Sequence, residues 1–227
     1  MDLGNLSPAL ILALVVGLAL APYVAVMVTA FTKLVVVFSL LRNALGLQQT
    51  PPNIVLNGLA LILSVYVMYP VGLEMADAAK PALVQDSLGS APRGSSSVSI
   101  GGLLGAAEKA KEPLRAFLVK HTDDEEREFF LATAKKMLPE AKRASLTRDD
   151  LIVVVPAFTV NELARAFQIG FILFLPFLVI DLIVANVLQA LGMMMLSPTT
   201  ISLPFKLLLF VLLDGWSKLI HGLVLTY

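Results

Sequence analysis

The fold is decided by FQIGFILFLPFLVIDLIVANVLQALGMMMLSP, which runs from Phe167 to Pro198. A helix needs about 20 apolar residues to cross a bilayer, and the apolar part of this stretch exceeds that length with one charged side chain, Asp181. Three consecutive methionines follow where the chain should turn, although turns favour Gly, Pro, Asn, Asp and Ser. The stretch therefore predicts a membrane helix that ends in an unusually apolar loop.

The composition of the whole chain also predicts a membrane protein. The 227 residues are 57% hydrophobic and 15% charged, whereas roughly 25% of residues in a soluble domain are charged. Charge is concentrated in residues 75–150, which hold 12 of the 17 Lys and Arg residues and 12 of the 17 Asp and Glu residues. Because these charges balance, we expect no nucleic acid partner.

Four apolar stretches have the length of membrane helices. They are Pro8–Ala30, Ile54–Leu73, Phe167–Leu191 and Ile201–Leu225. The third is awkward as a simple span, because a single helix over residues 160–191 would be about 48 Å long and would contain Pro176. We predict an all-α membrane protein that consists of two helical hairpins and a small helical insert.

The pattern divides the chain into three regions. Residues 1–74 form the N-terminal hydrophobic hairpin, residues 75–150 the polar insert, and residues 151–227 the C-terminal hydrophobic hairpin with the methionine loop. Within the insert, the composition of residues 86–102 is rich in Gly, Ser and Pro and indicates a flexible linker.

The basic residues of a short connection predict the orientation. Lys33 and Arg42 lie between the first and second apolar stretches, and the positive-inside rule places such a connection in the cytoplasm. The insert would then lie outside the cytoplasm, on the periplasmic side.

Two helices are expected in the insert. Pro113 suits the first turn of one helix, and TDDEEREFFLATAKKMLP, residues 122–139, predicts a second. The second helix begins with Thr122 and Glu125 in capping-box spacing. Its apolar face at i, i+4 and i+8 should dock on the surface of the protein; it consists of Phe129, Thr133 and Met137.

Several ionisable residues lie in or beside the apolar stretches, where such groups face protein or a water-filled cavity. Glu162 completes a capping box with Thr159, so it is expected at a helix N-terminus. Arg165 is three residues from Glu162, within reach of a local ion pair, and Asp214 and Lys218 have the favourable i, i+4 order.

Asp181 and Lys206 have no opposite charge within one turn of their own helices. An unpaired charge would be costly there, so each should find a partner on another segment, with each other or in another subunit. Two hairpins offer few such neighbours, which favours an oligomer.

No catalytic, metal or cofactor site is indicated by the sequence. The chain has no cysteine, its two histidines, His121 and His221, are far apart, and no nucleophile motif is present. Asp181 and Asp214 lack any surrounding motif for acid chemistry. We therefore expect neither an enzyme nor a bound cofactor.

Two segments carry a specific resemblance. PAFTVNELARAFQIGFILFLPFLVIDLIVANVLQALGMMMLSPTTISLPFKLLLFVLLDGW (Pro156–Trp216) and FTKLVVVFSLLRNALGLQQTPPNIVLNGLALIL (Phe31–Leu63) resemble the export-gate family SctR/YscR/FliP of type III secretion systems. HTDDEEREFF, residues 121–130, is similar to the injectisome branch more than to the flagellar branch.

The resemblance implies a core subunit of the export gate in the bacterial inner membrane. Members of the family assemble as five copies with SctS/FliQ-like and SctT/FliR-like subunits into a helical pore. SctU/FlhB-like and SctV/FlhA-like components supply unfolded protein substrates to this pore. Part of the apolar surface would then contact protein, although membrane lipid remains a partner.

The resemblance also assigns roles to residues. The family closes its pore with a methionine gasket, and the motif places the gasket at Met193, Met194 and Met195. Gly192 and Pro198 bracket the loop as its hinge residues. The polar contacts between helices or subunits fall on Glu162, Arg165, Asp181 and Lys206.

Two other interpretations stay open on the residues alone. The chain could be a subunit of an ion or solute transporter or channel, with Asp181 and Lys206 in the path. It could also be a structural membrane scaffold, in which three flexible methionines fill an irregular gap.

Overall fold

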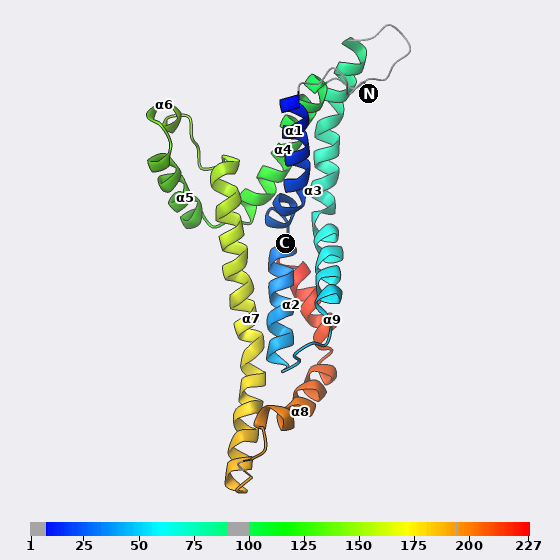
Figure 1. Ribbon diagram of the computed structural model, residues 1–227, viewed down its shortest axis with the longest axis vertical. Coiled ribbons are helices and arrows are strands. Elements are labelled where there is room, and N and C mark those ends of the chain that lie inside the picture. Colours follow the sequence, from blue (N-terminus) through cyan, green and yellow to red (C-terminus); the bar gives the residue numbers. More distant parts are fainter. Residues whose placement is uncertain (1–7, 90–99, 194) are drawn as a thin grey trace. The chain divides into compact units, whose positions relative to one another are not determined.

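The computed structural model describes residues 8–89, 100–193 and 195–227, and all regular structure in them is helical (Figure 1). This confirms the all-α prediction. The helices of the described residues are α1 (Pro8–Met27), α2 (Phe31–Ala44), α3 (Asn53–Gly89), α4 (Ile100–Lys120), α5 (Asp124–Met137), α6 (Glu140–Arg143), α7 (Leu151–Ala190), α8 (Pro198–Leu212) and α9 (Gly215–Val224).

The chain folds as two compact units. The first contains the described residues of Met1–Thr29 and Met68–Asn161, and the second contains Ala30–Val67 and Glu162–Tyr227. Helices α3 and α7 contribute residues to both. The methionine loop and all four residues predicted to make polar contacts, Glu162, Arg165, Asp181 and Lys206, belong to the second unit.

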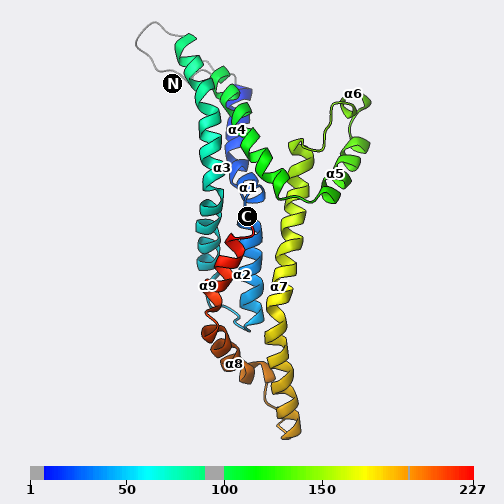
Figure 2. The same cartoon turned by 180° about the vertical axis from the view of Figure 1, so that it is seen from behind.

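Helix α2 is the centre of the second unit. It lies between α7 and α9 in both views (Figures 1 and 2). Its inward face is fully buried at i, i+3, i+4 and i+7, the spacing of one helix face; these residues are Leu34, Val37, Phe38 and Leu41. Gly170 of α7 admits the Leu40 side chain, because a Cβ atom at Gly170 would come within 2.2 Å of Leu40 Cδ1.

The first unit has its own small core. Phe117 of α4 packs on Phe158 of α7 with ring centroids 5.9 Å apart. Thr159 ties α1 to α7, because its hydroxyl donates to the Met27 carbonyl at 3.2 Å.

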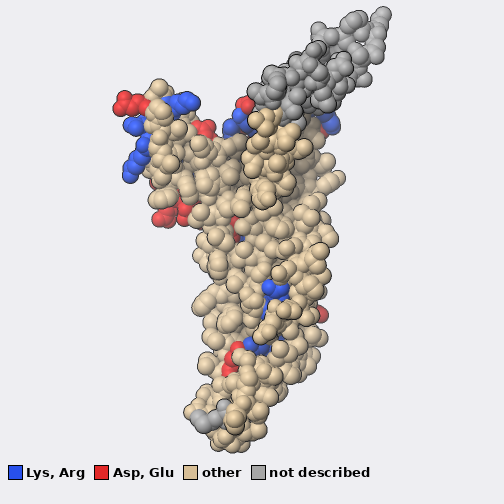
Figure 3. Space-filling model, in the orientation of Figure 1, with Lys and Arg blue, Asp and Glu red and all other residues tan. Residues whose placement is uncertain are grey.

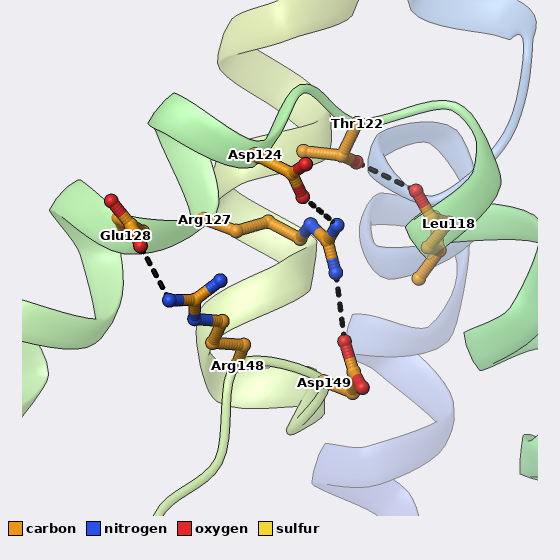
Figure 4. Close-up of polar contacts among 7 residues, drawn as sticks. All are labelled: Leu118, Thr122, Asp124, Arg127, Glu128, Arg148 and Asp149. Carbon is orange, nitrogen blue, oxygen red and sulfur yellow. Dashed lines mark hydrogen bonds and ion pairs between the residues drawn. The ribbon is translucent and has the colours of Figure 1, made fainter.

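Ion pairs connect α5 to the segment before α7 (Figure 4). Arg127 lies between Asp124 and Asp149 and donates to Asp149 Oδ1 at 2.8 Å, and Arg148 pairs with Glu128 at 2.5 Å. These pairs hold α5 by charge, since none of its residues is buried.

The helices of the insert differ from the prediction in three respects. Helix α4 begins at Ile100, well before Pro113, because the helix-forming segment AAEKAK precedes the proline. Asp123 occupies the N-cap position of α5, and the Thr122 hydroxyl donates backward to the Leu118 carbonyl at 2.6 Å, so the capping box is absent (Figure 4). The predicted linker, residues 86–102, is helical at both ends, and residues 90–99 lie outside the described residues.

Two residues of the predicted apolar face of α5 are exposed in the described part of the chain, and Thr133 between them is half-buried. Phe129 is 62% exposed and Met137 is 81% exposed. Phe129 contacts the Phe130 ring of its own helix. The predicted docking is therefore not seen at Phe129 and Met137 in the described residues, where charge pairs connect α5 to the chain instead.

Two described helices are long and apolar enough to cross a membrane, Asn53–Pro81 within α3 and Leu151–Ala190. Two further helix pairs are each bent at a short break, and the total is four if each pair counts as one span. The pairs are Val15–Met27 with Phe31–Ala44, and α8 with α9. The chain is a membrane protein by these criteria. Figure 3 shows charged side chains gathered over α5 and α6, and few charges over α8.

The last predicted span is broken. Helices α8 and α9 are bent by 60° at a break where Asp214 takes a positive φ of 51°. Asp214 thus precedes α9 as its N-cap residue, and the described residues show no ion pair between Asp214 and Lys218. The expected i, i+4 pair fails because the two residues do not share a continuous helix.

Replacing Leu34 by Ala should destabilise the second unit by about 2–5 kcal/mol, the usual cost of a cavity at a fully buried leucine. Circular dichroism during denaturation in detergent measures the loss. Leu61→Ala is the matched control, because Leu61 is 55% exposed. Equal stability of the two variants would contradict the central position of α2.

Candidate functional site: a methionine loop above buried ion pairs

The methionine loop starts from a well-formed helix end. Gly192 has φ +72°, a left-handed conformation that glycine adopts without strain. Its amide donates to the Gln189 carbonyl at 3.1 Å, and the Met193 amide donates to the Leu188 carbonyl at 2.9 Å. These two bonds form a Schellman motif, which satisfies the terminal carbonyls of α7.

The other end of the loop is also set by local chemistry. Ser197 is the N-cap residue of α8, and Pro198 occupies the first helical turn, where the fixed φ of proline is favourable. The amide of Leu196 donates to the Met193 carbonyl at 3.3 Å, which closes a turn across the loop. The loop that connects the end of α7, Ala190, to the start of α8, Pro198, is therefore short.

Two of the three methionine side chains lie in the described residues, and both are exposed. Met193 is 45% exposed and Met195 is 100% exposed, and Met194 lies outside the described residues. Apolar side chains this exposed at a loop tip commonly mark a surface that meets another molecule.

Asp181 and Lys206 form an ion pair behind this loop. Lys206 Nζ lies 2.6 Å from Asp181 Oδ2 and donates to the Ala44 carbonyl at 3.2 Å. Ser202 donates to the other oxygen of Asp181 at 2.5 Å. The Ala44 carbonyl ends α2, where a cation is also favourable for the helix dipole. One lysine thus connects α2, α7 and α8.

A second ion pair is more deeply buried. Lys33 of α2 and Glu162 of α7 are 1% and 0% exposed, and Lys33 Nζ lies 3.2 Å from Glu162 Oε2. The ring of Tyr227 covers the ammonium group at 3.6 Å, and its hydroxyl donates to Glu162. Burial and then the Glu162 charge raise the pKa of Tyr227, so the phenol stays protonated as the donor.

Glu162 does not lie at the N-terminus of a helix, as the capping pattern predicts. Helix α7 begins at Leu151 and contains both Thr159 and Glu162. The Thr159 hydroxyl donates to the Val155 carbonyl at 2.9 Å instead of accepting from a free backbone amide. The predicted capping box is wrong because the apolar residues before Thr159 already continue the helix. Arg165 is half-buried one turn after Glu162.

Sequence reasoning missed Lys33, Ser202 and Tyr227 as members of the site. Lys33 was counted among the charges of a connection between spans, whereas it lies inside α2 and is buried. The available signal was the period of the apolar residues from Leu34 to Leu41, which indicates a helix face. Arg42 also lies in α2, in its last turn, but it is not fully buried, so the predicted orientation rests on Arg42 alone.

The two ion pairs connect α2 to α7 and α8, the helices on either side of the methionine loop. The described residues contain no group of three His, Cys, Asp or Glu side chains placed to hold a metal ion. Four charges in the apolar part of the second unit form two ion pairs, Lys33 with Glu162 and Lys206 with Asp181. The remaining feature is the exposed pair Met193 and Met195.

The sequence of this membrane chain matches the FliP family over residues 14–223. The chain belongs to the FliP family. It is 52% identical to the hypersensitivity response secretion protein HrcR of Ralstonia nicotianae over 223 residues, which cover 98% of this chain and 99% of that protein.

Other relatives come from both branches of the FliP family. The chain is 50% identical to the Yop proteins translocation protein R of Yersinia pestis over 210 residues, 92% of each chain. It is 41% identical to the flagellar biosynthetic protein FliP of Bacillus subtilis over 217 residues, which cover 96% of this chain and 90% of that protein. The predicted family is confirmed, and these secretion and translocation proteins resemble the chain more than the flagellar FliP does.

Replacing Lys33 by Met should destabilise this FliP-family chain by about 3–5 kcal/mol, because Glu162 is left buried without its cation. The double variant Lys33→Met, Glu162→Gln should recover most of the loss, since the amide oxygen still accepts from Tyr227. Thermal unfolding in detergent measures both.

The matched control is Lys80→Met. Lys80 pairs with Asp77 at 2.6 Å, but both side chains are 71% exposed, so the loss should be less than about 1 kcal/mol. A double variant as unstable as Lys33→Met would contradict the account of an uncompensated charge.

Proposed function

We propose that this chain is a core subunit of a type III secretion export gate, the inner-membrane pore through which unfolded proteins are exported. The observation that carries the proposal is the family match over residues 14–223, together with 50% identity to a protein named for the translocation of Yop proteins. The injectisome branch is favoured over the flagellar branch by the higher identity to HrcR.

In this proposal Met193, Met194 and Met195 form the gasket of the pore. Met193 and Met195 are exposed at a loop whose backbone amides bond within the loop and to the last turn of α7, so their side chains are available to meet those of other copies. Methionine is apolar and unbranched. Side chains of this kind exclude water and small ions when they converge, and they repack around a passing chain of any sequence.

The pore would contain five copies of the chain. A single loop cannot surround an opening, whereas five copies would bring fifteen methionines to one axis. Gly192 and Pro198 would fix the direction in which each loop points. SctS/FliQ-like and SctT/FliR-like subunits would complete the complex, and SctU/FlhB-like and SctV/FlhA-like components would deliver the substrates.

The same proposal gives the regions of the chain their places. The hydrophobic hairpins, residues 1–74 and 151–227, would form the wall of the pore in the inner membrane. The polar insert, residues 75–150, would lie on the periplasmic side. Phe129 and Met137 are then exposed on a face that neighbouring copies or later parts of the secretion channel can cover.

A transporter subunit has less support. In that case Asp181 and Lys206 would lie in a solute path, but they bind each other at 2.6 Å, and Lys206 is 3% exposed. A transporter should move a solute alone in liposomes, whereas an export-gate subunit should need its partners.

Replacing Met193, Met194 and Met195 together by Ala should raise the ion conductance of the assembled complex several-fold, because three short side chains leave the opening unsealed. Planar-bilayer recording or ion leakage across the membrane of expressing cells measures the effect. Native mass spectrometry after co-expression with the partner subunits checks that the assembly is intact.

Met137→Ala is the matched control, because Met137 is equally apolar and 81% exposed but lies in α5. It should leave the conductance unchanged. An unchanged conductance in the triple variant would reject the gasket.

Charge reversal at Asp181 tests the ion pair between Asp181 of α7 and Lys206 of α8, the two helices that the methionine loop connects. Asp181→Lys places two cations beside the Ala44 carbonyl and should prevent assembly, which native gels would reveal. The double exchange Asp181→Lys, Lys206→Asp should restore part of it. Normal complexes from the single variant would argue against a role of this ion pair in assembly.

A further inference from the structure

An apolar groove lies in the second unit, between α7 and the broken helix pair α8 and α9. Its volume is about 500 Å³. Of the described residues that line it, only Lys218 and Thr226 have polar side chains. Its rim is open, since Ile172 is 65% exposed and Leu213 is 51% exposed.

Two glycines give the groove its form. A Cβ atom at Gly215 would come within 2.2 Å of Phe210, so glycine allows this ring to lie against the backbone at the break. A Cβ atom at Gly222 would meet nothing within 4 Å. Gly222 therefore faces open space along the groove, and a larger side chain there would fill the groove without a clash.

The lining of the groove favours a flexible apolar chain as its occupant, because almost all of the side chains that line it are apolar. An acyl chain is narrower than an α-helix, which is at least about 10 Å wide with its side chains, and it follows an irregular wall. In a membrane, the atoms that line an empty groove would lose their dispersion contacts on that side. An acyl chain in the groove would supply these contacts.

The charge at the groove indicates which lipid it takes. Lys218 is exposed, and none of the ion pairs among the described residues involves it. A lysine with an apolar stem along a groove can extend its ammonium group to a phosphate at the membrane interface. We propose that this groove binds one acyl chain of an anionic phospholipid, with the lipid phosphate beside Lys218. The proposal depends on the membrane location and not on export.

Photolabelling tests the proposal on the full-length chain in phosphatidylethanolamine vesicles. The probe is phosphatidylglycerol with a diazirine in its acyl chain, and peptide mass spectrometry locates the label. The expected result is strong labelling of α9 and of the facing part of α7, compared with the exposed Val65 face of α3. Labelling no stronger than at Val65 would overturn the proposal, as would chain-to-chain crosslinks at the groove that exclude the probe.

Two variants test the two parts of the site separately: the apolar groove at Gly222 and the cation at Lys218. Gly222→Leu should abolish the labelling of the groove, whereas Gly58→Leu, at a helical glycine that also has open space, should leave it unchanged. Lys218→Gln should lower the labelling by phosphatidylglycerol about fivefold, the effect of one cation near anionic lipid, and leave that by a phosphatidylcholine probe unchanged. Full labelling of Gly222→Leu, or equal labelling by both probes in the unaltered chain, would refute the assignment.

Discussion

The second unit depends on the requirement that every charge removed from water has a partner. Lys33 and Glu162 are almost fully buried and lie 129 positions apart in the sequence. Their pairing requires that α2 packs on α7, because either charge alone would be strongly unfavourable there. The pair of Lys206 and Asp181 imposes the same requirement on α8 and α7. Apolar packing supplies most of the contact area, but these two pairs select which helix faces meet.

The same constraint explains which parts of the site could be predicted. Asp181 and Lys206 were identifiable as partners because neither has an opposite charge nearby on its own helix. Glu162 was assigned to a helix cap because TVNE matches the capping pattern, and a local pattern does not reveal that the helix began eight residues earlier. Its true partner, Lys33, is distant in sequence, and no local rule connects the two.

The fold shows a similar division between local and distant information. Long apolar runs were sufficient to predict the membrane helices, and the acidic first turn, basic last turn and proline were sufficient to predict α5. Helix α2 was missed as an element because its two charges looked like those of a loop, although its apolar residues recur at helical spacing. The break between α8 and α9 depends on a left-handed residue, Asp214, and the apolar pattern on either side gives no sign of it.

The Schellman motif at Gly192 has a mechanical consequence. Because the carbonyls at the end of α7 are satisfied within the chain, the main chain of the loop does not have to change when its side chains do. Rearrangement can be confined to methionine rotamers, which for exposed side chains interconvert within picoseconds to nanoseconds. In the proposed gasket, the seal would recover its shape far faster than a lid that must refold, so closure after the end of a passing polypeptide would add no delay of its own.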